Sequence, residues 1–207
     1  MLGKNLFTRL KPRSLPSLSE APAHFDAGVR LAMEGFYGKA LVELKLAIRT
    51  NPNYAEARLE LGLTYHKMGQ LDRAIKAYLS ALEISPSLVT AYKNLGIAYD
   101  DLGHFLKALR VYIKAIALAP QDPELRNDLG LAYFNIGSYA DAIKAFKQAL
   151  DIDPHNAPAH YCLGLVYLDL DDNEMALAEH SQLKAWNEKE LAFLLLDQIQ
   201  RQSRQAS

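Results

Sequence analysis

Apolar and polar residues alternate along this chain with the period of an α-helix, and the whole pattern recurs every 34 residues. Each unit holds two segments of about 13 residues whose apolar positions lie three or four apart, which places them on one helix face. A glycine separates the two segments and a proline closes the unit. The pattern therefore predicts pairs of amphipathic helices, each about 20 Å long at 1.5 Å per residue.

Several kinds of residue keep the 34-residue step in strict register, which predicts a repeat architecture. They are Leu61, Leu95, Leu129 and Leu163; Gly62, Gly96, Gly130 and Gly164; Tyr65, Tyr99, Tyr133 and Tyr167; Ala74, Ala108, Ala142 and Ala176; and Pro52, Pro86, Pro120 and Pro154.

Two glycines in each unit need separate explanations. Gly69 stands between the two segments, where its freedom to adopt a left-handed conformation ends the first helix. Gly62 lies inside a predicted helix, where glycine costs about 1 kcal/mol relative to alanine. We expect it where the two helices cross, opposite the small Ala74, with Tyr65 and Tyr78 filling the space on either side.

These residues resemble the tetratricopeptide repeat: L-G-x-x-Y is followed by alanine, an aromatic residue, alanine and proline at fixed offsets. Three strong copies occupy 55–88, 89–122 and 123–156, and weaker copies occupy 21–54 and 157–190. The last copy departs from the pattern at Asp171, Asn173, His180 and Glu188. The resemblance implies an all-α, right-handed superhelical solenoid of antiparallel helix pairs, with atypical repeats at its ends.

Two segments lie outside the five copies. After the last copy, Lys189 to Gln202 has the pattern of one more helix, so we expect a capping helix within 191–207 and a frayed tail over its last five residues. Before the first copy, residues 1–20 form a basic extension.

Composition and charge exclude several classes of function. The chain has 207 residues, half of them hydrophobic, with 23 Lys and Arg against 24 Asp and Glu. The segment up to residue 19 carries +4 and the remainder −5, so no basic stripe predicts nucleic-acid binding. No run approaches the roughly 20 apolar residues of a membrane span. We expect a cytoplasmic protein, with peripheral membrane contact left open.

The sequence offers no reaction centre, so we predict no enzyme, metal or cofactor. Cys162 is the only cysteine, and His160 is two residues away, a spacing that does not share a helix face. We expect Cys162 to be a packed thiol and the histidines to lie on the surface. The acidic stretch 168–174 lacks the spacing of a calcium loop.

The resemblance also implies where a partner would bind, because the groove of the family is lined by the first helix of each repeat. The ninth position of each copy is aliphatic in all five. Two interpretations are open: these residues form an exposed apolar floor, or they pack between neighbouring first helices or under the chain's own N-terminus. The predicted groove residues are Phe25, Val29, Leu59, Leu63, Lys93, Ile97, Asn127, Leu131, Phe134, Tyr161 and Leu165.

One known ligand class of the family is disfavoured by the residues present. Members that capture the acidic tails of heat-shock chaperones use lysine, asparagine and arginine across three repeats. The comparable positions here hold Glu60, Leu63, Asn94, Glu124 and Asp128. We therefore predict no binding of such tails.

The basic extension has three interpretations: a disordered tail, a segment that folds back into the protein's own groove, and an anchor on an anionic membrane or a partner. We favour docking on a partner or on the protein itself. Leucines at 2, 6 and 10 form one face, and Pro12 and Pro16 limit any helix to a few turns. It is also similar to an organellar transit peptide. The residues that would make the contact are Lys4, Phe7, Arg9, Lys11 and Arg13.

Two classes of function fit these observations. The first is a non-enzymatic scaffold or adaptor that holds a helix or extended segment of another protein in its groove. The second is a structural subunit or assembly factor of a larger, membrane-associated complex. The side chains in the groove would choose the partner, because the frame of the repeat is common to all members.

Overall fold

A computed structural model describes residues 18–205 of the protein, and within this range every regular element is a helix, joined to the next by a short turn or loop. This confirms the all-α class. A short 3₁₀ turn at Leu18–Glu20 precedes eleven helices. They are α1 (Ala21–Met33), α2 (Tyr37–Thr50), α3 (Ala55–Lys67), α4 (Leu71–Ile84), α5 (Val89–Asp101), α6 (Phe105–Leu118), α7 (Pro123–Asn135), α8 (Tyr139–Ile152), α9 (Ala157–Asp169), α10 (Asn173–Ala185) and α11 (Lys189–Gln205).

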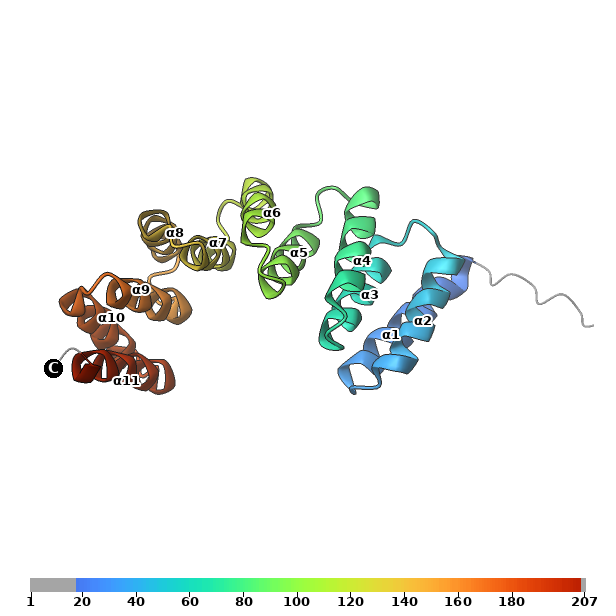
Figure 1. The fold of residues 1–207 in the computed structure, drawn as a ribbon. Coiled ribbons are helices and arrows are strands. Elements are labelled where there is room, and N and C mark those ends of the chain that lie inside the picture. The colour runs from blue at the N-terminus through green and yellow to red at the C-terminus, as the bar shows by residue number, and fades with distance from the viewer. Residues whose placement is uncertain (1–17, 206–207) are drawn as a thin grey trace, which may run out of the picture.

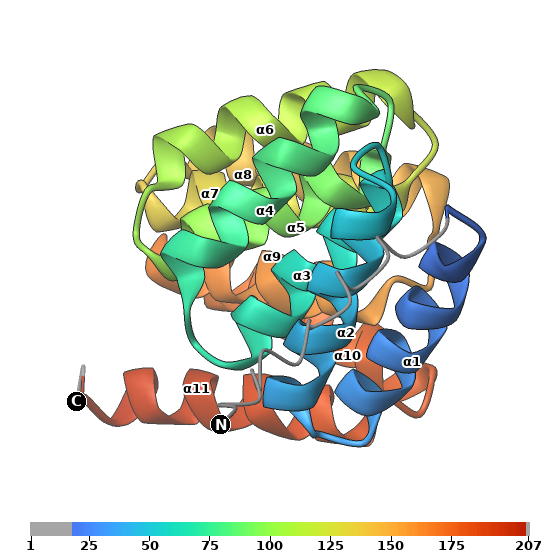
Figure 2. The ribbon, with the colours of Figure 1, turned by 90° about the vertical axis from the view of Figure 1, so that its right-hand side faces the viewer.

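The helices form a solenoid of five pairs followed by α11 (Figure 1). Each odd-numbered helix up to α9 packs against the helix that follows it, and the pairs succeed one another along an arc. The first helices of neighbouring pairs also touch, whereas the second helices of neighbouring pairs do not touch within residues 18–205. The first helices therefore lie at the smaller radius and line the concave face, while α6 and α8 lie on the outer side of the arc (Figure 1). Figure 2 shows the same solenoid from the side of α1 and α2.

The turns inside the pairs use the left-handed conformation that the sequence predicts. Gly69 has φ +69° and Gly103 has φ +71°. In the last pair and before α11 the same role falls to non-glycine residues, Asp171 with φ 59° and Asn187 with φ 63°. Aspartate and asparagine tolerate this region better than other side chains do, so the degenerate copy keeps its turn without glycine.

The glycines inside α3, α5 and α7 face aromatic rings, whereas Gly28 of α1 faces Leu44. The prediction that Gly62 opposes Ala74 is wrong, because the nearest atoms are those of the Tyr78 ring. A Cβ atom on Gly62 would lie 2.4 Å from Cε1 of Tyr78, the ring at the centre of the second helix. Gly130 meets Phe146 in the same way, at 2.6 Å. The glycine is thus a slot for a ring, and the ring is fully buried in it.

In the last pair, a side chain of α11 fills the space beside the glycine that an aromatic ring of the second helix fills in earlier pairs. A Cβ atom on Gly164 would lie 2.6 Å from Cδ2 of Leu195, which belongs to α11, whereas His180 of α10 is partly exposed. The helix also extends past its predicted end at Gln202, so most of the expected frayed tail is helical. Its last turn is held by Gln202, whose Nε2 donates to the carbonyl of Leu168 at 2.9 Å.

The basic extension lies almost wholly outside the described residues. The predictions for Lys4, Phe7, Arg9, Lys11 and Arg13 therefore stay predictions. Between residues 18 and 205, no helix has the length and apolar character needed to cross a bilayer.

Candidate functional site

The five aliphatic residues at the ninth position of each first helix are half-buried, a state between the two expectations for them. Each side chain from Leu63 onward packs partly against a core cluster yet keeps some surface on the concave face. They are Val29, Leu63, Ile97, Leu131 and Leu165. The concave face therefore has an apolar floor whose side chains pack partly against the core and are partly exposed to solvent.

The other apolar groove residues contribute unequally to this face. Phe25 is half-buried, and its ring centroid lies 5.0 Å from that of Tyr54. Phe134 is also half-buried, 5.9 Å from the ring of Tyr139, and Tyr161 packs against the C-terminal core. Leu59 is 8% exposed and belongs to the core, so it offers almost no surface to a partner.

One hollow of about 490 Å³ lies between the first two pairs. Val29 and Leu63 form its floor, Tyr37 of α2 closes one side, and Glu60 and Lys67 stand at its polar margin. Met33 at the end of α1 also lines it and is 84% exposed. The N-terminal part of the concave face therefore offers apolar surface to a ligand.

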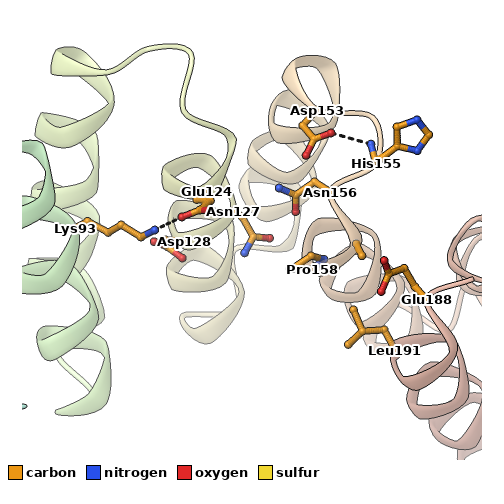
Figure 3. Close-up of a pocket in the computed structure, with 11 residues that line it drawn as sticks. Lys93, Glu124, Asn127, Asp128, Asp153, His155, Asn156, Pro158, Glu188 and Leu191 are labelled. Atoms are coloured by element: carbon orange, nitrogen blue, oxygen red, sulfur yellow. Dashed lines mark hydrogen bonds and ion pairs between the residues drawn. The ribbon is translucent and has the colours of Figure 1, made fainter. Parts of the chain in front are cut away.

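A second hollow, of about 600 Å³, lies further along the solenoid, and we call it the acidic pocket. Lys93 of α5 and three residues of α7, namely Glu124, Asn127 and Asp128, form one wall (Figure 3). The loop before α9 and the start of α11 form the opposite wall, with Asp153 and Glu188 among their residues. Four carboxylates thus face one ammonium group across a single space.

The polar groups of this pocket are incompletely paired. Lys93 forms an ion pair with Glu124. Burial raises the pKa of Asp128 to about 6, although the positive charge of Lys93 opposes the rise. Neither Oδ2 of Asp128 nor Oδ1 of Asn127, both buried, has a hydrogen-bond partner among residues 18–205, and Asn127 is only 8% exposed.

A further half-buried carboxylate lies on the preceding first helix. Asp100 accepts a hydrogen bond from the hydroxyl of Tyr112 at 2.8 Å through Oδ2, while its buried Oδ1 has no partner. Burial raises the pKa of Asp100 to about 6 against the lowering effect of the tyrosine bond, and Asp101 adds to the rise. Negative charge therefore gathers on the middle of the concave face.

One contact that the sequence analysis missed joins the two helices of the last pair, α9 and α10. His160 is buried, so the expectation of a surface histidine is wrong for it: Nδ1 lies 2.5 Å from the buried carboxylate of Glu179, and Nε2 lies 3.1 Å from the carbonyl of Pro154. Arg58 and Arg126, at the same position of earlier copies, donate to the carbonyls of the prolines six residues before them. That shared six-residue spacing was a signal available in the sequence.

Cys162 is buried, as a packed thiol should be, and burial raises its pKa to about 12. A thiol in this state is almost entirely protonated near neutral pH and is a poor nucleophile. Within residues 18–205, no group of three or more His, Cys, Asp and Glu side chains is arranged to hold a metal ion.

Family comparisons agree with the repeat. Three models of the tetratricopeptide repeat match the sequence: one over residues 93–157, one over 30–69 and again over 65–103, and one over 137–199. Together these matches cover the four helix pairs from α3 to α10 and part of the first pair, α1 and α2. Tetratricopeptide repeats are protein-interaction modules. No curated protein matches the chain significantly.

Solved structures of proteins called MamA have a similar fold. MamA from Desulfovibrio magneticus RS-1, from residue 41 to its end, is 25% identical with a TM-score of 0.76, over 82% of this chain and 96% of that one. Another MamA crystal structure is 26% identical with a TM-score of 0.72, over 79% of this chain and 95% of that one. MamA of strain AMB-1 is 26% identical with a TM-score of 0.66, over 82% of this chain and 93% of that one.

Proposed function

The chain belongs to the tetratricopeptide repeat family, and from that premise we propose that it is a non-enzymatic scaffold that holds a helix or extended segment of another protein in its concave groove. The observation that carries the proposal is the half-buried aliphatic row along the first helices. Such a row favours docking because covering its remaining surface removes apolar area from water at little cost in side-chain freedom.

The row is well placed for a segment that runs along the solenoid. Since neighbouring first helices touch, the ninth-position residues follow one another at regular steps on the concave face. A partner would place apolar side chains over this row, and the polar residues in the middle of the face would fix its register. The apolar contacts supply affinity in this arrangement, and the polar ones supply specificity.

The convex face supports a second function, that of a structural subunit or assembly factor in a larger complex. Large apolar side chains are exposed on the second helices: Leu79 on α4, and Leu106 and Ile113 on α6 are 42%, 67% and 52% exposed. Exposed apolar patches commonly mark contact sites. This function would use the outer helices and leave the groove free.

A pair of matched variants separates the two functions. Leu63→Gln with Leu131→Gln changes the ninth position of two copies, and Leu79→Gln with Ile113→Gln changes one convex position in two copies. The full chain and both variants are purified from the native host, with circular dichroism and melting temperature recorded for each. The groove function predicts that the first variant loses the co-purifying protein and the second retains it.

The reverse result, loss from the convex variant alone, would establish the second function and contradict the first. If the groove variant melts much earlier than the parent, the single substitution Leu63→Gln is used in its place, since one change to a half-buried side chain disturbs packing less.

A further inference from the structure

The acidic pocket combines negative charge with groups that lack partners. Glu124, Asp128, Asp153 and Glu188 line it, and the basic side chains among its lining residues are Lys93 and His155. Lys93 pairs with Glu124 and its charge also acts on Asp128, so a single lysine is shared among the carboxylates of the pocket. At close range in a partly desolvated space, such an excess of charge attracts a cation far more strongly than it would in bulk water.

Asn127 gives the pocket a second, independent sign of a ligand. This residue is more than nine-tenths buried, its side chain points into the space between α7 and the start of α11 (Figure 3), and its Oδ1 has no hydrogen-bond partner in the described part of the chain. A buried acceptor without a donor costs about 1–3 kcal/mol. Native proteins usually satisfy such groups with a protein, water or ligand partner.

The pocket also has an apolar wall. Ala157 and Pro158 at the start of α9, together with Leu191 of α11, line it beside the carboxylates. A small inorganic cation would gain nothing from these groups. A lysine or arginine side chain would lay its methylene stem against them while its charged end meets the carboxylates.

Two helix N-termini near the pocket would favour an anion, but their free N–H groups are already occupied. Asp122 caps α7 by accepting from the backbone N–H groups of Glu124 and Leu125. Asn156 caps α9 by accepting from Ala159 at 3.0 Å. The helix dipole adds about 0.3–1 kcal/mol for a well-placed charge, which is less than the repulsion an anion would meet from four carboxylates.

We propose that the acidic pocket binds a lysine or arginine side chain of the partner segment, so that the groove selects basic segments. This inference rests on the proposed function, since it names the chemistry of the segment that the groove would hold. The apolar row would hold the aliphatic side chains of that segment, and Asn127 with Asp128 would receive one of its cations.

Short labelled peptides test the proposal on the full chain. One alternates leucine with arginine, and its matched partner has glutamate in place of arginine; fluorescence anisotropy measures the binding of each. We expect only the arginine peptide to bind, and we expect Asp128→Asn with Glu188→Gln to weaken it by about tenfold or more. The control Asp72→Asn with Glu83→Gln removes the same charge from exposed positions on α4 and should change binding by less than about twofold.

The results for the two variants show whether the pocket assignment alone fails or the groove function fails with it. If the arginine peptide binds the pocket variant as well as the parent but is lost from the Leu63→Gln and Leu131→Gln variant, the groove function stands and the pocket assignment falls. Binding that survives in both variants contradicts both proposals. Tighter binding of the glutamate peptide overturns the assignment of basic segments and leaves the groove function standing. If removing residues 1–17 is needed before any peptide binds, the occupant is the chain's own basic extension and the partner assignment is overturned.

Discussion

Single residues account for much of the packing, and the glycine inside each first helix is the clearest case. Gly62, Gly96 and Gly130 each leave room for one aromatic ring from the second helix of the same pair. The repeat therefore keeps glycine and an aromatic residue 16 positions apart because each requires the other.

Gly130→Ala should destabilise the protein even though alanine is the better helix former. The new methyl would lie 2.6 Å from the Phe146 ring, which is completely buried and has no free space to move into. Overpacking of about 1–3 kcal/mol outweighs the propensity gain of up to about 1 kcal/mol. Thermal denaturation of Gly38→Ala is the control: that glycine lies in α2 with nothing near its Cβ position, so its variant should melt at or above the parent.

A rise in melting temperature for Gly130→Ala would contradict this account of the slot. The double variant Gly130→Ala with Phe146→Leu should recover part of the loss, because the smaller side chain vacates the space that the methyl needs.

The buried carboxylate of Asp128 lowers the stability of the folded protein by an amount that depends on pH. Its pKa is raised to about 6 by burial, against the opposing charge of Lys93 and with repulsion from Glu124, Asp100 and Asp122. Because the pKa of Asp128 is raised in the folded state, the folded protein binds the proton of this carboxyl group more tightly than the unfolded chain does. The cost of the buried charge is therefore absent below about pH 4 and complete above about pH 6.

Asp128→Asn should accordingly stabilise the protein by about 1–2 kcal/mol at pH 7.5, after allowance for partial solvent access, and have almost no effect at pH 4. Urea denaturation at the two pH values measures the difference, with exposed Asp151→Asn as the control. Equal stabilities of Asp128→Asn and parent at pH 7.5 would show that the carboxylate is already compensated. Since the same substitution should weaken peptide binding, stability and binding would change in opposite directions.

At the scale of the helix, the sequence predicted most elements and missed those that depend on contacts between distant segments. Helix pairs, turns and capping helix follow from a strict 34-residue pattern, because each copy repeats the same local physics. The role of Leu195 in the slot of Gly164 could not be predicted, since it joins α11 to α9 where α10 supplies His180. The buried pair of His160 and Glu179 likewise depends on how α9 meets α10.

The residues of the candidate site also divide into those that the repeat predicts and those that depend on contacts between distant segments. Positions on the first helices could be assigned to the concave face from the repeat, including Lys93 and Asn127. The contribution of Asp153 and Glu188 to the acidic pocket could not, because these residues stand in loops whose approach to α7 is set by the curvature of the solenoid.

Leu195→Ala should loosen the C-terminal end of the solenoid. Leu195 is fully buried, and removing it leaves a cavity beside Gly164, for which we expect a loss of about 2–4 kcal/mol. Hydrogen exchange should rise in α9, α10 and α11 and stay unchanged in α1 to α4, because each repeat contacts only its neighbours. Phe193→Ala, at a 69% exposed position of the same helix, should leave exchange as it is. Uniform acceleration along the chain would contradict local coupling.

At the scale of the whole molecule, two faces of one curved body have different chemistry. The concave face carries a half-buried aliphatic row and an acidic pocket, and the convex face carries scattered exposed leucine and isoleucine. The helices that line the inner face touch one another from pair to pair, so this face is continuous from α1 to α9. A continuous surface of this kind suits a long segment better than a small molecule.

The central claim is that the concave face binds the partner, and hydrogen exchange of the full chain with and without its co-purified partner tests it most directly. The account predicts slower exchange in the first helices α1, α3, α5, α7 and α9, with α5 and α7 included because the acidic pocket lies there. Protection confined to the second helices α2, α4, α6 and α8, with the first helices unchanged, would contradict it.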